Sequence, residues 1–149
     1  MIFIKSDDEV ELTRKSCLLV SKTHAMPAAE IAPGVTTSKL DKLAKEFILD
    51  NGGVPGFLNY NGFPNTLCVS VNDAVVHGIP SSLELKDGDI VSIDCGALMN
   101  GFYGDSCYTF EVGEAEPAVR ALLVCTKECL YKEIEQAVVG KRIGDIGNA

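Results

Sequence analysis

The stretch that decides the fold is Ile90-Val-Ser-Ile-Asp94-Cys-Gly-Ala-Leu-Met-Asn100-Gly101-Phe-Tyr-Gly-Asp105-Ser-Cys-Tyr-Thr-Phe110. At its centre stands Asn100-Gly101, a strong signal for a two-residue β-turn, because both turn positions need positive φ. Apolar residues recur at every second position on either side, as in strands with one buried face. The stretch therefore predicts a β-hairpin with strands over 90–98 and 102–112.

The predicted hairpin brings two carboxylates together. With the turn at 100–101, Asp94 lies opposite Cys107 and Asp105 lies opposite Gly96. Side chains two residues apart share a face, so Asp94 and Asp105 become diagonal neighbours on one side of the ribbon. The residues expected on the other side, toward the core, are Val91, Ile93, Ala97, Phe102, Tyr108 and Phe110.

Two carboxylates held this close repel each other when both are ionised. No Lys or Arg occurs within the stretch, and a divalent cation is the simplest way to neutralise the pair. Spacing alone also allows two solvated aspartates on an exposed face. His77, at the end of an apolar segment and just before Gly78, is a candidate polar partner or a structural residue. His24 is expected to be a surface or capping residue.

Helix signals dominate the two ends of the chain. Ser6 and Glu9 have the spacing of a capping box. The helices are predicted to run from this box to Pro33-Gly34, from Thr37 or Ser38 to Asn51, and from 117 to about 138, with a first helical turn near the end.

The middle of the chain has the composition of loops and strands. An ordered loop is expected over 55–64, a turn over 85–89, and two further strands over 66–71 and 74–77. The order of elements, α-α-β-β-β-β-α, predicts an α+β fold with a mostly antiparallel sheet.

Composition narrows the possible functions. The chain has 149 residues, 46% of them apolar, and a net charge of −8. A single domain over 1–149 is predicted. The negative charge argues against nucleic acid and anionic membranes as partners. No apolar run reaches the roughly 18–20 residues that span a bilayer, and the start of the chain does not resemble a signal peptide. A cytoplasmic location is predicted.

Six cysteines occur without a CxxC pair or the spacing of a disulfide framework. Most are therefore expected to be reduced and buried, and no structural zinc site is expected.

Three motifs resemble the methionine aminopeptidase family: Asn72-Asp-Ala-Val-Val-His77-Gly-Ile-Pro80, Leu85-Lys-Asp-Gly-Asp-Ile-Val-Ser-Ile-Asp94 and Asn100-Gly-Phe-Tyr-Gly-Asp105-Ser. Their order and spacing also fit, and the resemblance covers nearly all of the chain. Asn59-Tyr-Asn-Gly-Phe-Pro64 is similar to the family as well.

The resemblance implies a fold and a chemistry beyond what spacing indicates. It implies the pita-bread fold, in which two similar α+β halves hold two divalent ions (cobalt, manganese, iron or zinc), with this chain as the amino-terminal half. Asp94 would be a bidentate ligand of one ion, and Asp105 would bridge both. His77 would be the catalytic residue that donates a hydrogen bond to the substrate.

The implied reaction is removal of the initiator methionine from proteins with a small second residue. The partners would be the amino termini of nascent polypeptides, for example at the ribosome. His77 would bind the substrate beside the scissile peptide bond, and the methionine side chain would lie in an apolar pocket lined by Phe57, Tyr60, Phe63 and Cys68. Aromatic rings and sulfur suit a thioether, because sulfur–aromatic contacts are favourable.

The chain also departs from the family. The family's remaining ligands, one histidine and two glutamates, belong to a second half that is absent here. We therefore expect an amino-terminal portion that binds metal weakly, is inactive alone and exposes an apolar face. Two alternatives stay open: a proline-directed peptidase with the same fold, and a non-catalytic binding module that uses half of it.

Overall fold

The structure, a computed structural model, describes residues 3–149. The chain divides into two compact units, Met1–Glu114 and Ala115–Ala149. The first contains two helices and the whole sheet, and the second contains two helices. The single domain over 1–149 stays a prediction.

The helices of the first unit begin where the sequence predicts. Helix α1 covers Asp7–Glu30 and has the capping box: the Ser6 hydroxyl accepts from the Glu9 amide at 3.3 Å, and the Glu9 carboxylate accepts from the Ser6 amide at 2.8 Å. Helix α2 covers Thr37–Asp50, with the Thr36 side chain as its N-cap. These caps satisfy amides that the first helical turn leaves without partners.

The sheet is antiparallel, with β3 (Ile90–Met99) in the middle. Strand β4 (Phe102–Glu111) pairs along one side of β3, and β1 (Val54–Pro55) and β2 (Leu67–Val71) pair along the other.

The predicted hairpin register is confirmed. Asp94 pairs with Cys107 and Gly96 with Asp105. Both turn residues have positive φ, 52° at Asn100 and 82° at Gly101. The two-residue turn therefore places Asp94 and Asp105 on the same face of the sheet.

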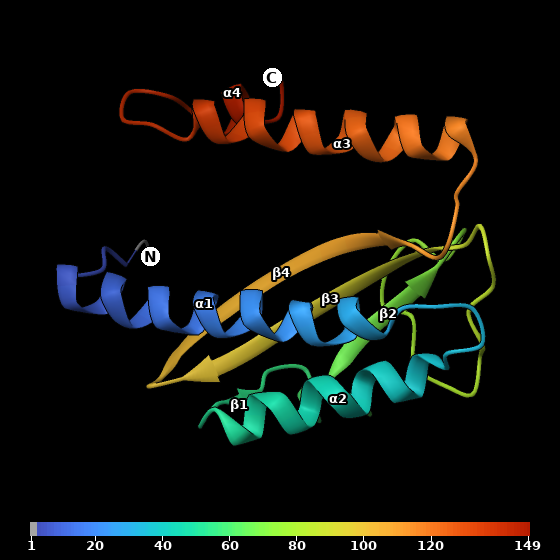
Figure 1. The fold of residues 1–149 in the computed structure, drawn as a ribbon. Helices are drawn as coiled ribbons and strands as arrows, with labels where there is room; N and C mark the ends of the chain where they lie inside the picture. Colours follow the sequence, from blue (N-terminus) through green and yellow to red (C-terminus); the bar gives the residue numbers. More distant parts are fainter. Residues whose placement is uncertain (1–2) are drawn as a thin grey trace. The chain divides into compact units, whose positions relative to one another are not determined.

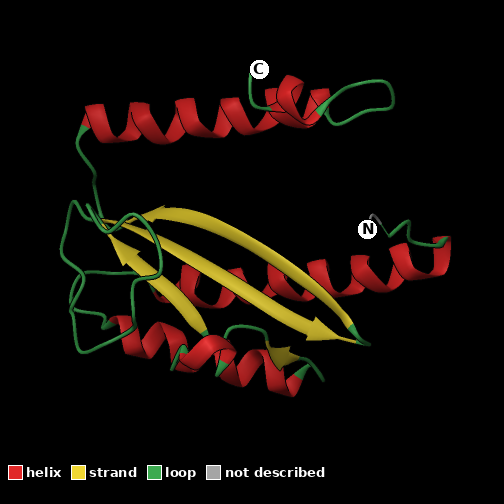
Figure 2. Cartoon of the chain, turned by 180° about the vertical axis from the view of Figure 1, so that it is seen from behind, coloured by secondary structure: helices red, strands yellow, loops and turns green. Residues whose placement is uncertain are grey.

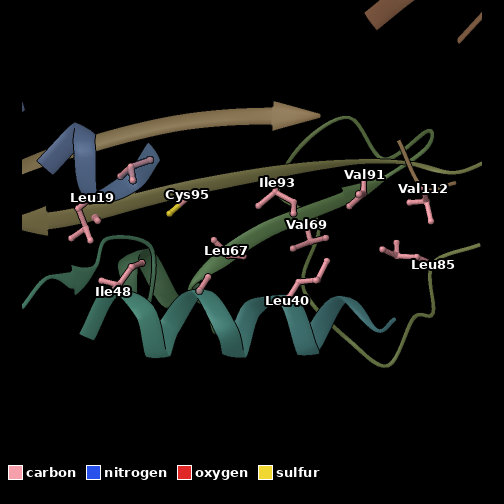
Figure 3. Packing of buried hydrophobic residues seen from close by; sticks show 13 residues of the cluster. Leu19, Leu40, Ile48, Leu67, Val69, Leu85, Val91, Ile93, Cys95 and Val112 are labelled. Atoms are coloured by element: carbon pink, nitrogen blue, oxygen red, sulfur yellow. The ribbon is translucent and has the colours of Figure 1, made fainter. Parts of the chain in front are cut away.

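Helices α1 and α2 lie on one face of this sheet (Figure 1). A view from behind shows the strands in front of these two helices (Figure 2). Leu40 and Ile48 of α2 meet Leu67, Ile93 and Cys95 in the core between helix and sheet (Figure 3). Asp94 alternates with Ile93 and Cys95, so its carboxylate lies on the face that the helices leave open.

Three details of the prediction are wrong. Residues 74–77 form no strand, since they lie in a loop where Asn72 and His77 have positive φ. Pro55, the first residue of the expected loop, belongs instead to strand β1 and pairs with Ala97 of β3. Tyr108, expected in the core, is 49% exposed on the edge strand β4, whereas Val91, Ile93 and Ala97 are fully buried.

The cysteines are free, as predicted, but most of them are not buried. All six cysteines of the described chain are free, but only Cys68 and Cys95 are buried. Cys17, Cys107, Cys125 and Cys129 are exposed because they lie on helix or strand faces outside the core.

The second unit contains α3 (Pro117–Gln136) and the short α4 (Ile143–Ile146). The predicted last helix and the helical turn after it are confirmed. No side chain of residues 117–136 is buried, and Leu122, Leu130 and Ile134 are each more than half exposed. Among residues 3–149, no helix combines the length and the apolar character that crossing a bilayer requires.

Candidate active site

The open face of the sheet carries a pocket of about 600 Å³. Its volume falls within the range of small-molecule sites. All seven residues predicted for the site line it: Phe57, Tyr60, Phe63, Cys68, His77, Asp94 and Asp105. The structure therefore brings together side chains from β2, β3 and β4 and from two separate loops.

Asp94 and Asp105 form the acidic part of the pocket. Asp94 is half-buried and Asp105 is exposed. Burial raises the pKa of Asp94, and the charge of Asp105 raises it further, while His77 and the Cys95 amide act in the opposite direction. None of the described residues that line the pocket is Lys or Arg, and His77 is the one lining side chain whose charge favours ionised Asp94. Two carboxylates with so little compensating charge are an environment that a divalent cation fits.

These two carboxylates can supply only part of a metal site. Among residues 3–149, no group of three or more His, Cys, Asp and Glu side chains is placed to hold an ion. Oxygen ligands of this kind suit hard or borderline divalent cations, and affinity rises with the number of charged ligands.

His77 lies on a loop that is fastened to β2. Its own φ is 58°, a left-handed conformation uncommon for residues other than glycine. The next residue anchors it: the Gly78 amide donates to the Ser70 hydroxyl at 3.1 Å, and the Gly78 carbonyl accepts from the Val69 amide at 2.8 Å. A Cβ at position 78 would collide with the Val69 carbonyl. Glycine at 78 therefore permits the approach that holds His77 at the pocket.

The aromatic wall comes from the loop after β1. Asn59 and Asn61 have left-handed φ values of 66° and 49°, and the Asn59 amide donates to the Phe63 carbonyl at 2.8 Å. This tight backbone presents Phe57, Tyr60 and Phe63 to the pocket.

Cys68 lies directly opposite Asp94 on β2. Burial, followed by the charge of Asp94, raises the pKa of Cys68 to about 11. The thiol is therefore protonated at neutral pH, and it presents an uncharged, polarisable surface to the pocket.

Sequence reasoning missed four lining residues, Asn61, Gly62, Pro64 and Ile79. Each is a near neighbour of a predicted site residue, so the two loops themselves were the available signal.

His24 is not a cap. It lies within α1 and is half-buried against β4, where its Nε2 is 3.0 Å from the Ser106 carbonyl oxygen and its Nδ1 is buried without a hydrogen-bond partner.

Comparisons with known proteins agree with this geometry. Residues 11–149 match the model of metallopeptidase family M24. A methionine aminopeptidase of Clostridium perfringens is 45% identical over 148 residues, which are 99% of this chain and 59% of that protein. The chain thus spans about three fifths of the length of this relative.

Solved structures show the same relationship. The crystal structure of methionine aminopeptidase from Rickettsia prowazekii superposes with a TM-score of 0.97 at 36% identity, covering 99% of this chain and 59% of that one. Prolidase from Pyrococcus furiosus superposes with a TM-score of 0.79 at 22% identity, over 96% of this chain and 41% of that one, which shows a shared fold alone. The predicted pita-bread architecture is confirmed, and this chain belongs to metallopeptidase family M24.

Proposed function

We propose that this chain is part of a metal-dependent aminopeptidase that removes the initiator methionine from proteins with a small second residue. The observation that carries the proposal is a pocket in which a pair of carboxylates, with no Lys or Arg in the lining, lies beside an aromatic wall and a neutral thiol. The likeness to methionine aminopeptidases over 99% of the chain supports it.

Asp94 and Asp105 are the residues that would hold two divalent ions, of cobalt, manganese, iron or zinc. When bound, such ions supply Lewis-acid activation of a water molecule and of the scissile carbonyl. His77, held in its strained loop, would donate a hydrogen bond to the substrate oxygen that gains negative charge.

The other pocket residues would bind the first side chain of the substrate. Phe57, Tyr60, Phe63 and Cys68 provide an apolar and polarisable lining, with which a thioether makes favourable contacts. The carboxylates of Asp94 and Asp105 at one end would attract a protonated amino terminus. Nascent polypeptides in the cytoplasm, some of them at the ribosome, are the substrates that this arrangement suits.

The proposal concerns the whole enzyme rather than residues 1–149 alone. Two carboxylates are fewer ligands than a tight divalent site uses. We propose that a second half of the same fold supplies the rest, as the 59% coverage of the relative suggests.

The test begins with the intact mass of the protein as its source cell makes it. That protein, loaded with Mn²⁺ or Co²⁺, should release methionine from a Met-Ala-Ser peptide, and Asp94→Asn or Asp105→Asn should lower kcat/KM by at least about a thousandfold. Asp50→Asn, on the exposed end of α2, is the matched control and should leave the rate unchanged.

Two results would redirect the assignment. Cleavage of an Xaa-Pro dipeptide without cleavage of Met-Ala-Ser would favour the proline-directed alternative. An intact mass of 15.9 kDa with no hydrolysis of either peptide would favour a binding module.

A further inference from the structure

Gly96 lies on β3 directly beneath the ring of Phe57. A Cβ built at Gly96 would stand 2.5 Å from Cε1 of Phe57 and 3.0 Å from its Cζ. These separations are shorter than van der Waals contact allows, so even an alanine methyl and the present ring position exclude each other. Gly96 is buried, and the aromatic ring occupies the space of the absent side chain.

The backbone before Phe57 holds the ring in this place. The Gly56 amide donates to the Gly96 carbonyl at 2.8 Å, as an extension of the pairing between β1 and β3. A Cβ at Gly56 would be 3.0 Å from the carbonyl carbon and oxygen of Gly96. The two glycines therefore let the loop approach β3 closely, and the ring of Phe57 follows.

The position of this contact matters for the pocket. Gly96 pairs with Asp105 across the hairpin and shares its face with Asp94 two residues away. Phe57, Asp94 and Asp105 all line the pocket. The ring on Gly96 thus forms the wall next to the carboxylates, and moving it off β3 takes it toward the space that it now lines.

We propose that Gly96 is a specificity-determining residue: the absence of a side chain at this position lets the ring of Phe57 pack against β3 and sets the depth of the apolar pocket. The pocket so formed takes a long, unbranched apolar first side chain. The inference deepens the proposed function and rests on it, because Gly96 acts on the substrate only through the ring of Phe57.

The experiment uses the protein as its source cell makes it. Gly96→Ala should shift Phe57 into the pocket and shorten it by about one heavy atom. Loss of room for one methylene-sized group changes kcat/KM by at least about tenfold. The kcat/KM for Met-Ala-Ser relative to norvaline-Ala-Ser, whose first side chain is one heavy atom shorter, should fall by about this factor, mainly through KM.

A second substitution tests whether the ring carries the effect. Phe57→Leu in the Gly96→Ala background should restore much of the preference for methionine, because the shorter side chain can share the space with the new methyl group. Gly144→Ala is the matched control, since a Cβ there meets nothing within 4 Å, and it should leave the ratio unchanged. A crystal structure of Gly96→Ala should show the ring displaced from β3.

Each outcome decides the question. An unchanged ratio in a folded Gly96→Ala variant, or a shift that Phe57→Leu does not reverse, overturns the inference while the proposed function stands. If Gly96→Ala does not fold, Phe57→Leu alone decides: the inference expects faster cleavage of a peptide beginning with ethionine, which is one methylene longer than methionine, and no gain overturns it. Failure of the unsubstituted protein to release methionine would instead contradict the proposed function.

Discussion

Asp94 and His24 lie on opposite faces of the same sheet, and burial shifts the pKa of each in the direction that favours the neutral side chain. Burial and the charge of Asp105 raise the pKa of Asp94, whereas burial lowers the pKa of His24 despite its hydrogen bond to the Ser106 carbonyl. A bound cation can compensate the charge on Asp94. Protonated His24 would instead be a half-buried cation with a donor, Nδ1, that faces no partner.

At the scale of this residue we expect a measurable pH dependence of stability. Because the pKa of folded His24 lies below its ordinary value of 6.5, the unfolded chain takes up the proton first as the pH falls. The contribution of His24 is thus fully present above pH 6.5 and is lost as the pH falls toward the folded pKa.

His24→Gln keeps a donor for the Ser106 carbonyl and does not titrate. Urea unfolding of both proteins should show the unsubstituted chain losing more free energy of unfolding between pH 7 and pH 5 than the variant does. Parallel curves across this range would contradict the prediction.

Among the elements, the packing of α1 on β4 depends on one glycine of the strand. A Cβ at Gly104 would lie 2.5 Å from the carbonyl carbon of Ser16 and 2.6 Å from the amide nitrogen of Cys17. The Ser16 hydroxyl also donates to the Phe102 carbonyl at 2.8 Å, so the helix cannot retreat without breaking that bond.

Gly104→Ala should therefore destabilise the chain by about 1–3 kcal/mol, the usual cost of overpacking a core. Chemical denaturation checks this value, and Gly144→Ala, with open space around it, should change stability by less than about 0.5 kcal/mol. A Gly104→Ala chain as stable as the unsubstituted one would mean that α1 can shift at no cost.

The turn residues and the strand alternation were enough to predict the hairpin from the sequence, but not the conformation of the loops, which depends on contacts with distant residues. Asn100-Gly101 restricts the turn, and strand alternation then determines which side chains share a face with Asp94. Val75 and Val76 have the composition of a strand, but the segment is a loop because Gly78 packs on Val69 from a distant part of the chain. Likewise, no sequence spacing reveals that Phe57 lies on Gly96.

For the molecule as a whole, the exposed apolar side chains of α3 form a surface that favours association with other molecules. Leu122, Leu130 and Ile134 recur at multiples of four positions, so they share one side of the helix, and they are 60%, 52% and 55% exposed. Side chains of this size in one stripe tend to associate.

The 149-residue polypeptide, prepared by itself, should therefore elute from size-exclusion columns as an oligomer or aggregate. Leu130→Lys combined with Ile134→Lys should shift it toward the monomer, while Lys127→Glu, a charge change on the same helix, should not. A compact monomer of the unsubstituted chain would refute the expectation.

The short connection between the two carboxylates has a consequence for how the chain folds. One tight turn joins Asp94 and Asp105, so their separation is established when the hairpin forms, an event of roughly 1–10 μs. Phe57 and His77 must instead be brought in by closing much longer loops, which is entropically costlier and slower. The acidic pair is thus a feature of low contact order that can assemble early, and the apolar wall of the pocket is added to it later.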